Sequence, residues 1–132
     1  MALGGGIGTL MRFGLSEWVA TMQLGAPLAV LVINISGCFL IAFLNLLSDP
    51  SGHVYLGPGS RAFLMVGFCG GYTTFSSFSL LSFEAMRHGH LFDLWLNVLL
   101  SHGLCGLGIW LGHVIAAAFP RLWFKFNRLL RI

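Results

Sequence analysis

Charged residues are scarce in this chain of 132 residues: they make up 8% of it, whereas hydrophobic residues make up 57%. A soluble domain carries about 25% charged residues, so the composition excludes an ordinary soluble domain. One crossing of a bilayer takes about 20 apolar residues. The chain is therefore long enough for four membrane spans and little else, and we predict a single all-α integral membrane domain.

Cysteine is also rare, and its number is odd. Cys38, Cys69 and Cys105 all fall within long apolar stretches. An odd set of three thiols does not make a disulfide framework, and free cysteines behave as small apolar side chains. We expect all three to serve as small apolar packing residues of the helices that contain them.

Signatures of catalysis are missing as well. The chain has no P-loop and no set of nucleophile, base and orienting group, which argues against an enzyme. His102 and His113 lie in an apolar stretch without a carboxylate cluster, so we expect them to be packed or hydrogen-bonded rather than bound to a metal. The start of the chain also lacks the charged opening and Ala-x-Ala site of a cleavable signal peptide.

Four apolar stretches are the candidate membrane spans. Pro27 suits the first turn of the second, and Pro120 is expected to end the fourth. A polar connection separates the second stretch from the third. The predicted spans cover residues 3–19, 27–47, 61–86 and 91–119.

The positive charge of the chain gathers at its C-terminal end. Basic residues three or four apart, with apolar residues between them, are typical of a helix lying on anionic lipid, and this makes nucleic acid a poor alternative partner. With four spans, the two termini and the second loop share one side of the membrane. The basic residues of the tail and Arg61 lie on that side, whereas the other side has Arg87 alone, so the positive-inside rule places both termini in the cytoplasm. The basic tail is residues 120–132, with Arg121, Lys125, Arg128 and Arg131.

The third stretch is interrupted by a run of glycines, hydroxyls and two phenylalanines, from Gly70 to Ser79: Gly-Gly-Tyr-Thr-Thr-Phe-Ser-Ser-Phe-Ser. Backbone groups released from a helix find no partner in lipid, so irregular structure at that depth lines a protein-enclosed cavity. Phe75 and Phe78 share one helix face. Ring edges carry partial positive charge, and rings beside hydroxyls solvate a small anion without a fixed cation that would trap it. The run predicts a broken third helix and an ion path.

Other polar side chains lie within the spans. Asn34 is in the middle of the second, and Asn97, Ser101 and Cys105 recur every four residues on the fourth, where they form one weakly polar stripe. A polar side chain in lipid is costly unless it finds a partner or water. Two interpretations stay open for these residues: hydrogen bonds between helices, or the lining of a pore.

Two further motifs accompany the run in the third stretch. The first stretch contains Gly5-Gly6-x-Gly8-x-x-x-Arg12-Phe13, and the second contains Val32-Ile33-Asn34-x-x-Gly37-x-Phe39. With Gly-Gly-x-Thr-Thr-Phe-Ser-x-Phe-Ser in the third, the chain resembles the CrcB/Fluc fluoride channels over nearly its whole length. The resemblance implies an antiparallel, dual-topology homodimer in the bacterial inner membrane, which exports fluoride passively. Such a dimer needs both orientations of the chain, whereas the basic tail favours one of them.

The resemblance also implies roles for individual residues. Arg12 would lie near the vestibule of the pore, and the backbone carbonyls of Gly70 and Thr73 would hold a central, structural sodium ion. Where the family has a glutamate, this chain has Leu81, and its nearest carboxylate is Glu84. The implied fluoride pathway comprises Phe75, Phe78, Asn34, Thr74, Ser76, Asn97, Ser101 and Cys105.

Two other functions remain as alternatives. A proton-coupled transporter of fluoride or another small anion would use Arg12, Glu84 and His102 as an exchange relay. A non-conducting membrane assembly protein would move no ion. Substitution of Phe75 or Phe78 separates this last alternative from a pore, because only a pore loses its function when a ring is removed.

Overall fold

The computed structural model describes the backbone of residues 1–49 and 56–129, and the side chains of the same residues up to 119. Every regular element within these ranges is helical. The order is α1 (Ala2–Thr21), α2 (Gly25–Leu47), α3 (Pro58–Arg61), η1 (Ala62–Cys69), α4 (Gly70–Tyr72), α5 (Phe75–Arg87) and α6 (Leu91–Leu129).

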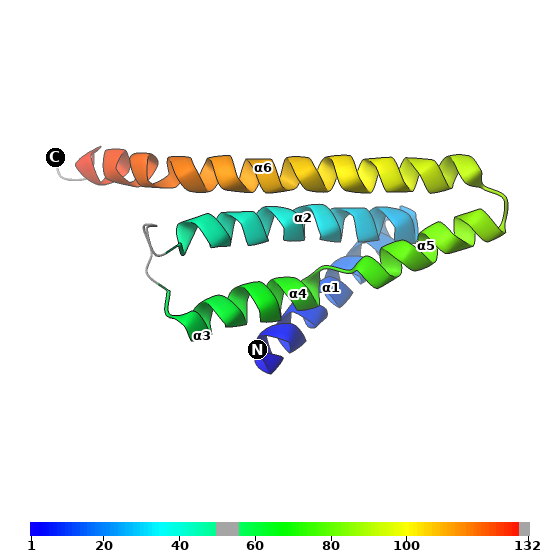
Figure 1. The fold of residues 1–132 in the computed structure, drawn as a ribbon, viewed down its shortest axis with the longest axis horizontal. Helices are drawn as coiled ribbons and strands as arrows, with labels where there is room; N and C mark the ends of the chain where they lie inside the picture. Colours follow the sequence, from blue (N-terminus) through cyan, green and yellow to red (C-terminus); the bar gives the residue numbers. More distant parts are fainter. Residues whose placement is uncertain (50–55, 130–132) are drawn as a thin grey trace.

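The helices lie side by side around α2. Figure 1 shows α6 running beside α2 along the length of the molecule, with the segment from α3 to α5 on the other side of α2. The first helix, α1, crosses this segment and contacts η1 and α4. The ribbon leaves the helical path between α4 and α5, close to the middle of the third segment.

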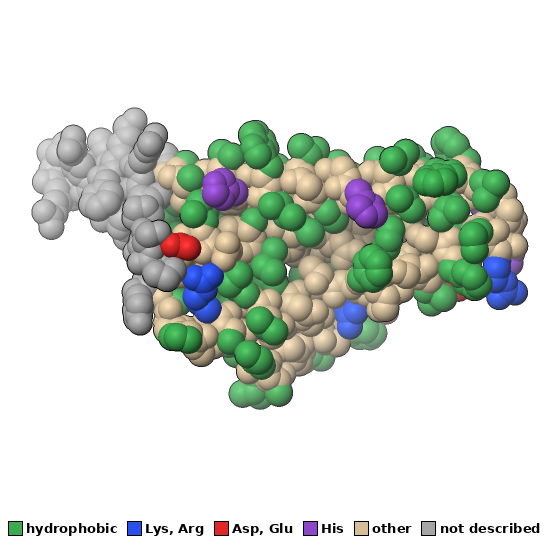
Figure 2. All heavy atoms as spheres, in the orientation of Figure 1, with side chains coloured by type: hydrophobic (Ala, Val, Ile, Leu, Met, Phe, Trp, Pro, Cys, Tyr) green, Lys and Arg blue, Asp and Glu red, His purple; other side chains and the backbone are tan. Residues whose placement is uncertain are grey.

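Hydrophobic side chains cover much of the outer surface, and charged side chains are few on the face that Figure 2 shows. Among the described residues, three stretches are long and apolar enough to cross a membrane: Gly25–Leu47, Pro58–Arg87 and Leu91–Phe119. The chain is therefore a multi-pass membrane protein. The helix α1, which contains Arg12 and Glu17, is not among these stretches, so the span at residues 3–19 stays a prediction.

The prediction that Pro120 ends the fourth helix is wrong, because α6 continues through it to Leu129. Proline has no N–H to donate to the carbonyl four residues earlier, here that of Ala116. This removes one hydrogen bond of the helix, and the backbone after Pro120 keeps its helical path nonetheless. The basic side chains predicted to lie on lipid belong to residues 120–132 and are outside the described residues.

After α3, the third segment continues as a π-helix, Ala62–Cys69, which the sequence did not predict. A π-helix is wider than an α-helix because each N–H bonds the carbonyl five residues back, and such segments are frequent at functional sites. This one ends directly before Gly70, the first residue of the interrupted run.

Glycines let α1 approach the third segment closely. Gly4 and Gly8 are buried on α1, as small residues on one face of a membrane helix allow. A Cβ atom at Gly8 would lie 2.9 Å from the backbone nitrogen of Tyr72 and 3.1 Å from the carbonyl carbon of Phe68. Because both atoms belong to backbone, a side chain here forces the helices apart.

The substitution Gly8→Ala is therefore expected to destabilise the protein by about 1–3 kcal/mol, the usual range for overpacking. The measurement is the thermal unfolding of the purified protein in detergent. Gly6→Ala is the matched control, since a Cβ atom at Gly6 meets nothing within 4 Å. Equal melting temperatures for the two variants would contradict the close contact.

Candidate functional site

The break in the third segment consists of two threonines. The backbones of Thr73 and Thr74 are extended, with ψ angles of 157° and 105°. The carbonyl of Cys69 accepts the last regular hydrogen bond before the break, from the Thr73 N–H at 3.0 Å. It also accepts one from the Thr73 hydroxyl at 2.9 Å. The backbone groups after this point need partners from elsewhere.

Asn34 of α2 supplies two of these partners. Its Oδ1 accepts a hydrogen bond from the Thr74 N–H at 2.8 Å, and its Nδ2 donates one to the Thr74 carbonyl at 3.1 Å. In a continuous helix the Thr74 N–H would instead bond the carbonyl of Gly70. Asn34 therefore holds the break open, and one hydrogen of its amide group remains for another acceptor.

Thr74 caps the helix that follows. Its Oγ1 accepts a hydrogen bond from the Ser77 N–H at 3.2 Å and lies 2.9 Å from the Ser77 hydroxyl and 3.4 Å from that of Ser76. In a continuous helix the Ser77 N–H would bond the carbonyl of Thr73. The carbonyls of Gly70 and Thr73, the two predicted cation ligands, have thus both lost their helical donors to side chains.

Three rings follow one another from α5 to α6. The ring centroids of Phe75 and Phe78 are 5.7 Å apart, and those of Phe78 and His102 are 5.9 Å apart with an edge-to-face geometry. Phe78 is 9% exposed, whereas Phe75 is 77% exposed. The Nδ1 atom of His102 lies 2.8 Å from the Val98 carbonyl. His102 is exposed, and of the expectation that it is packed or hydrogen-bonded, the hydrogen bond is confirmed.

A row of hydrogen bonds connects the polar stripe of α6 to α5. The buried Ser101 hydroxyl donates to Oδ1 of Asn97 at 3.4 Å, and Nδ2 of Asn97 donates to the hydroxyl of Ser82 at 3.0 Å. Ser82 in turn donates to the carbonyl of Phe78 at 2.9 Å. Ser82 is not among the residues predicted from the sequence. Its position four residues after Phe78 was a usable signal, because residues four apart share a helix face.

A groove of about 500 Å³ brings most of the predicted site together. Its wall includes the paired rings, the break and part of the stripe, and it is also lined by His102 and all three cysteines. The predicted site residues that line it are Asn34, Gly70, Thr73, Phe75, Phe78, Ser101 and Cys105.

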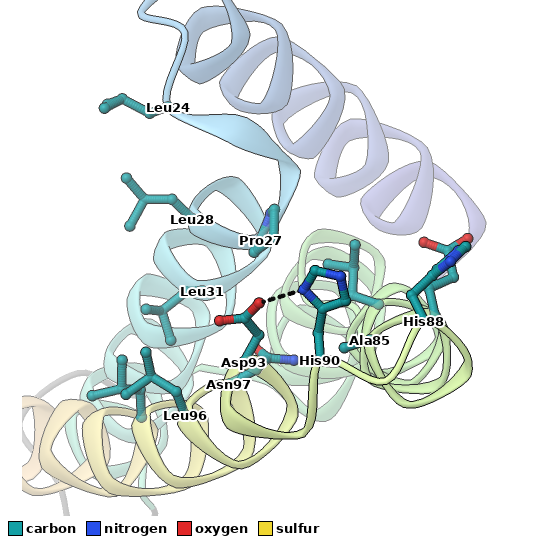
Figure 3. A pocket seen from close by; sticks show the side chains of 13 residues that line it. Leu24, Pro27, Leu28, Leu31, Ala85, His88, His90, Asp93, Leu96 and Asn97 are labelled. Atoms are coloured by element: carbon teal, nitrogen blue, oxygen red, sulfur yellow. Dashed lines mark hydrogen bonds and ion pairs between the residues drawn. The ribbon is translucent and has the colours of Figure 1, made fainter.

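A second cavity, of about 580 Å³, lies where α5 meets α6 (Figure 3). Asn97 lines this cavity and bonds Ser101, which lines the groove. At its rim Nδ1 of His90 lies 3.2 Å from Oδ2 of Asp93, the pair marked in Figure 3. The displaced Glu84 lines this cavity too. Asn97 thus stands between the two hollows.

Besides Asn97, three predicted residues lie off the groove wall. Thr74 is buried at the break, and Ser76 is exposed on the first turn of α5. Arg12 is half-buried on α1 and lines neither the groove nor the second cavity. Its role at a vestibule stays a prediction.

The comparison with known proteins agrees with the resemblance seen in the motifs. The family described as CrcB-like protein, Camphor Resistance (CrcB), matches residues 1–113. The fluoride-specific ion channel FluC of Methylocella silvestris is 40% identical over 91% of this chain and 92% of its own length. That of Paramagnetospirillum magneticum is 43% identical over 92% and 95%, and that of Rhodospirillum rubrum is 44% identical over 86% and 89%. These relatives are ion channels, and the chain belongs to the CrcB family.

Proposed function

We propose that this protein is a fluoride-selective ion channel that exports fluoride passively from the cytoplasm, rather than an enzyme or a pump. The observation that carries the proposal is the groove in which the Phe75 and Phe78 rings, the break held by Asn34 and the hydroxyl of Ser101 meet. The names of the relatives, fluoride-specific ion channels at 40% to 44% identity, support fluoride as the ion.

The groove suits a small anion in three ways. Phe75 and Phe78 offer ring edges with partial positive charge. The N–H groups of Phe75 and Ser76 begin α5 and have no partner within that helix, and the helix dipole favours negative charge at this end. The wall of the groove contains no Arg or Lys among the described residues. Fluoride is therefore held by weak donors and is released again, as conduction requires.

The path continues along the stripe of α6. Ser101 and Asn97 lead from the groove to the second cavity, and Ser82 extends the hydroxyl row onto α5. Cys105 lies one turn beyond Ser101 on the same face. We infer that the stripe serves as a polar track, with Asn34, Thr74 and Ser76 as further donors near the rings.

A second copy of the chain would complete the pore. We infer an antiparallel, dual-topology homodimer in the bacterial inner membrane, with the broken third segments of the two copies at its centre. The 77% exposure of Phe75 supports a partner surface there. The carbonyls of Gly70 and Thr73 fit a central sodium ion, since a hard cation prefers oxygen ligands and both carbonyls have lost their helical donors. Bound there, sodium would supply a fixed positive charge between the copies.

The driving force needs no cofactor. Hydrofluoric acid crosses the membrane as a neutral molecule and ionises in the less acidic cytosol, where the fluoride anion is trapped. A membrane potential that is negative inside then drives fluoride outward through an open path. The protein has only to provide the path and exclude other ions.

Voltage-driven efflux from proteoliposomes tests this proposal. With a potassium gradient and valinomycin to set the potential, we expect fluoride efflux to follow the voltage and to stay unchanged when a proton gradient is added. A rate that depends strictly on the proton gradient would favour the coupled transporter. Efflux no faster than from protein-free liposomes would favour a non-conducting assembly protein.

A further inference from the structure

Ser82 lines neither the groove nor the second cavity, yet it is hydrogen-bonded to one residue of each. Its hydroxyl donates to the carbonyl of Phe78, which lines the groove, at 2.9 Å. It accepts from Nδ2 of Asn97, which lines the second cavity and is labelled in Figure 3, at 3.0 Å. Ser82 is thus placed to influence both hollows without lining either of them.

The hydroxyl hydrogen of Ser82 determines the direction of these bonds. A serine hydroxyl has one hydrogen to donate and lone pairs that accept. Because its hydrogen is used by the Phe78 carbonyl, Ser82 can only accept from Asn97. The amide nitrogen of Asn97 must therefore face Ser82, and its Oδ1 is left to accept from the Ser101 hydroxyl at 3.4 Å.

With the amide held in this direction, two hydrogens are left for an anion. The second N–H of Asn97 has no acceptor among the described residues. The hydroxyl hydrogen of Ser101 is on a bond of 3.4 Å, longer than the usual range of about 2.5–3.0 Å for O–H···O. It is therefore weakly held and can turn toward an anion in the groove that Ser101 lines. Ser82 itself has no hydrogen to offer.

We propose that Ser82 is a positioning residue of the fluoride path, which keeps the Asn97 amide turned so that Asn97 and Ser101 can both donate to a passing fluoride. This inference rests on the proposed function. Without the Ser82 hydroxyl, the amide is free to turn over and donate from Nδ2 to the Ser101 oxygen. Its Oδ1 would then stand where the nitrogen was, and an acceptor oxygen repels an anion.

A double-mutant cycle on fluoride efflux tests the proposal, with wild type, Ser82→Ala, Asn97→Ala and the double variant. We expect Ser82→Ala to slow efflux about fivefold, the effect of losing one ordinary hydrogen bond that the path requires. Because Ser82 acts through Asn97, we expect the double variant to conduct at the rate of Asn97→Ala alone. The measurement is the initial rate of efflux from proteoliposomes at a fixed membrane potential.

Two further variants separate positioning from a role in packing. Ser82→Thr keeps a hydroxyl that can bond the carbonyl four residues back, so we expect it to retain the wild-type rate. Ser79→Ala is the matched control, since Ser79 is half-buried on the same helix and lines neither hollow. The melting temperature of Ser82→Ala in detergent is expected to stay close to that of wild type, because the Phe78 carbonyl keeps its helical N–H donor within α5.

Wild-type efflux in Ser82→Ala would overturn the positioning role. So would a double variant that is slower than Asn97→Ala, because Ser82 would then act by another route, or a Ser82→Thr variant as slow as Ser82→Ala, because the hydroxyl would then not be the cause. Absence of fluoride efflux from wild type would instead overturn the proposed function, and the positioning role with it.

Discussion

Replacing Phe75 or Phe78 with isoleucine is expected to slow fluoride efflux about tenfold or more, because a loss of about 1.4 kcal/mol at the barrier lowers a rate tenfold. Isoleucine keeps an apolar side chain of moderate size but has no ring edge to face the anion. The centroids of the two rings lie 5.7 Å apart in the groove, so each substitution removes one ring of the pair. The measurement is the initial rate of efflux from proteoliposomes at a fixed membrane potential.

The two phenylalanines differ in burial, so their substitutions differ in the packing they remove. Phe78 is buried against His102, so its replacement also removes core packing. Phe75 is 77% exposed, so its replacement leaves no cavity within the subunit. Phe83→Ile is the matched control, since Phe83 is on the same helix but lines neither the groove nor the second cavity. Wild-type efflux in both Phe75→Ile and Phe78→Ile would rule out a role of the rings in conduction.

The substitution Asn34→Leu is expected to destabilise the protein strongly. It leaves the N–H and the carbonyl of Thr74 without the partners they have at 2.8 and 3.1 Å. Each buried backbone group left unpaired costs about 1–3 kcal/mol, and water is not there to replace the partner within the membrane. We expect a large drop of the melting temperature in detergent and loss of fluoride efflux in the protein that remains folded.

Asn45→Leu provides the control for this prediction. Asn45 is on the same helix, and its Oδ1 accepts a hydrogen bond from the Arg61 guanidinium at 2.8 Å. That bond is exposed, and water can take the place of the lost partner. We expect a cost of about 1 kcal/mol or less. If Asn34→Leu lowered the melting temperature no more than Asn45→Leu does, the proposed role of Asn34 at the break would be contradicted.

The helical class and the irregular backbone within the interrupted run could be predicted from the sequence, because both depend on local pattern. Apolar stretches of span length identify membrane helices, and two glycines followed by a run of hydroxyl residues mark backbone that leaves the helix. The structure adds what makes this possible: Asn34 bonds Thr74 from 40 positions away in the sequence. No local pattern indicates which backbone group a distant side chain will meet, so the sequence left Asn34 with two interpretations.

The features that the sequence did not predict also have physical reasons. Pro120 was expected to end α6, but one missing N–H removes a single hydrogen bond, and the helix continues to Leu129. The π-helix Ala62–Cys69 has the same apolar composition as an α-helix would, so composition gave no sign of it. Ser82 is one hydroxyl among many in the sequence, and only its bond to Asn97 distinguishes it.

The most direct test of the central claim is a comparison of fluoride and chloride efflux from the same proteoliposomes under the same membrane potential. A fluoride-selective channel releases the trapped fluoride rapidly and retains the chloride. Efflux of both ions at similar rates, or fluoride efflux no faster than from liposomes without protein, would contradict the claim.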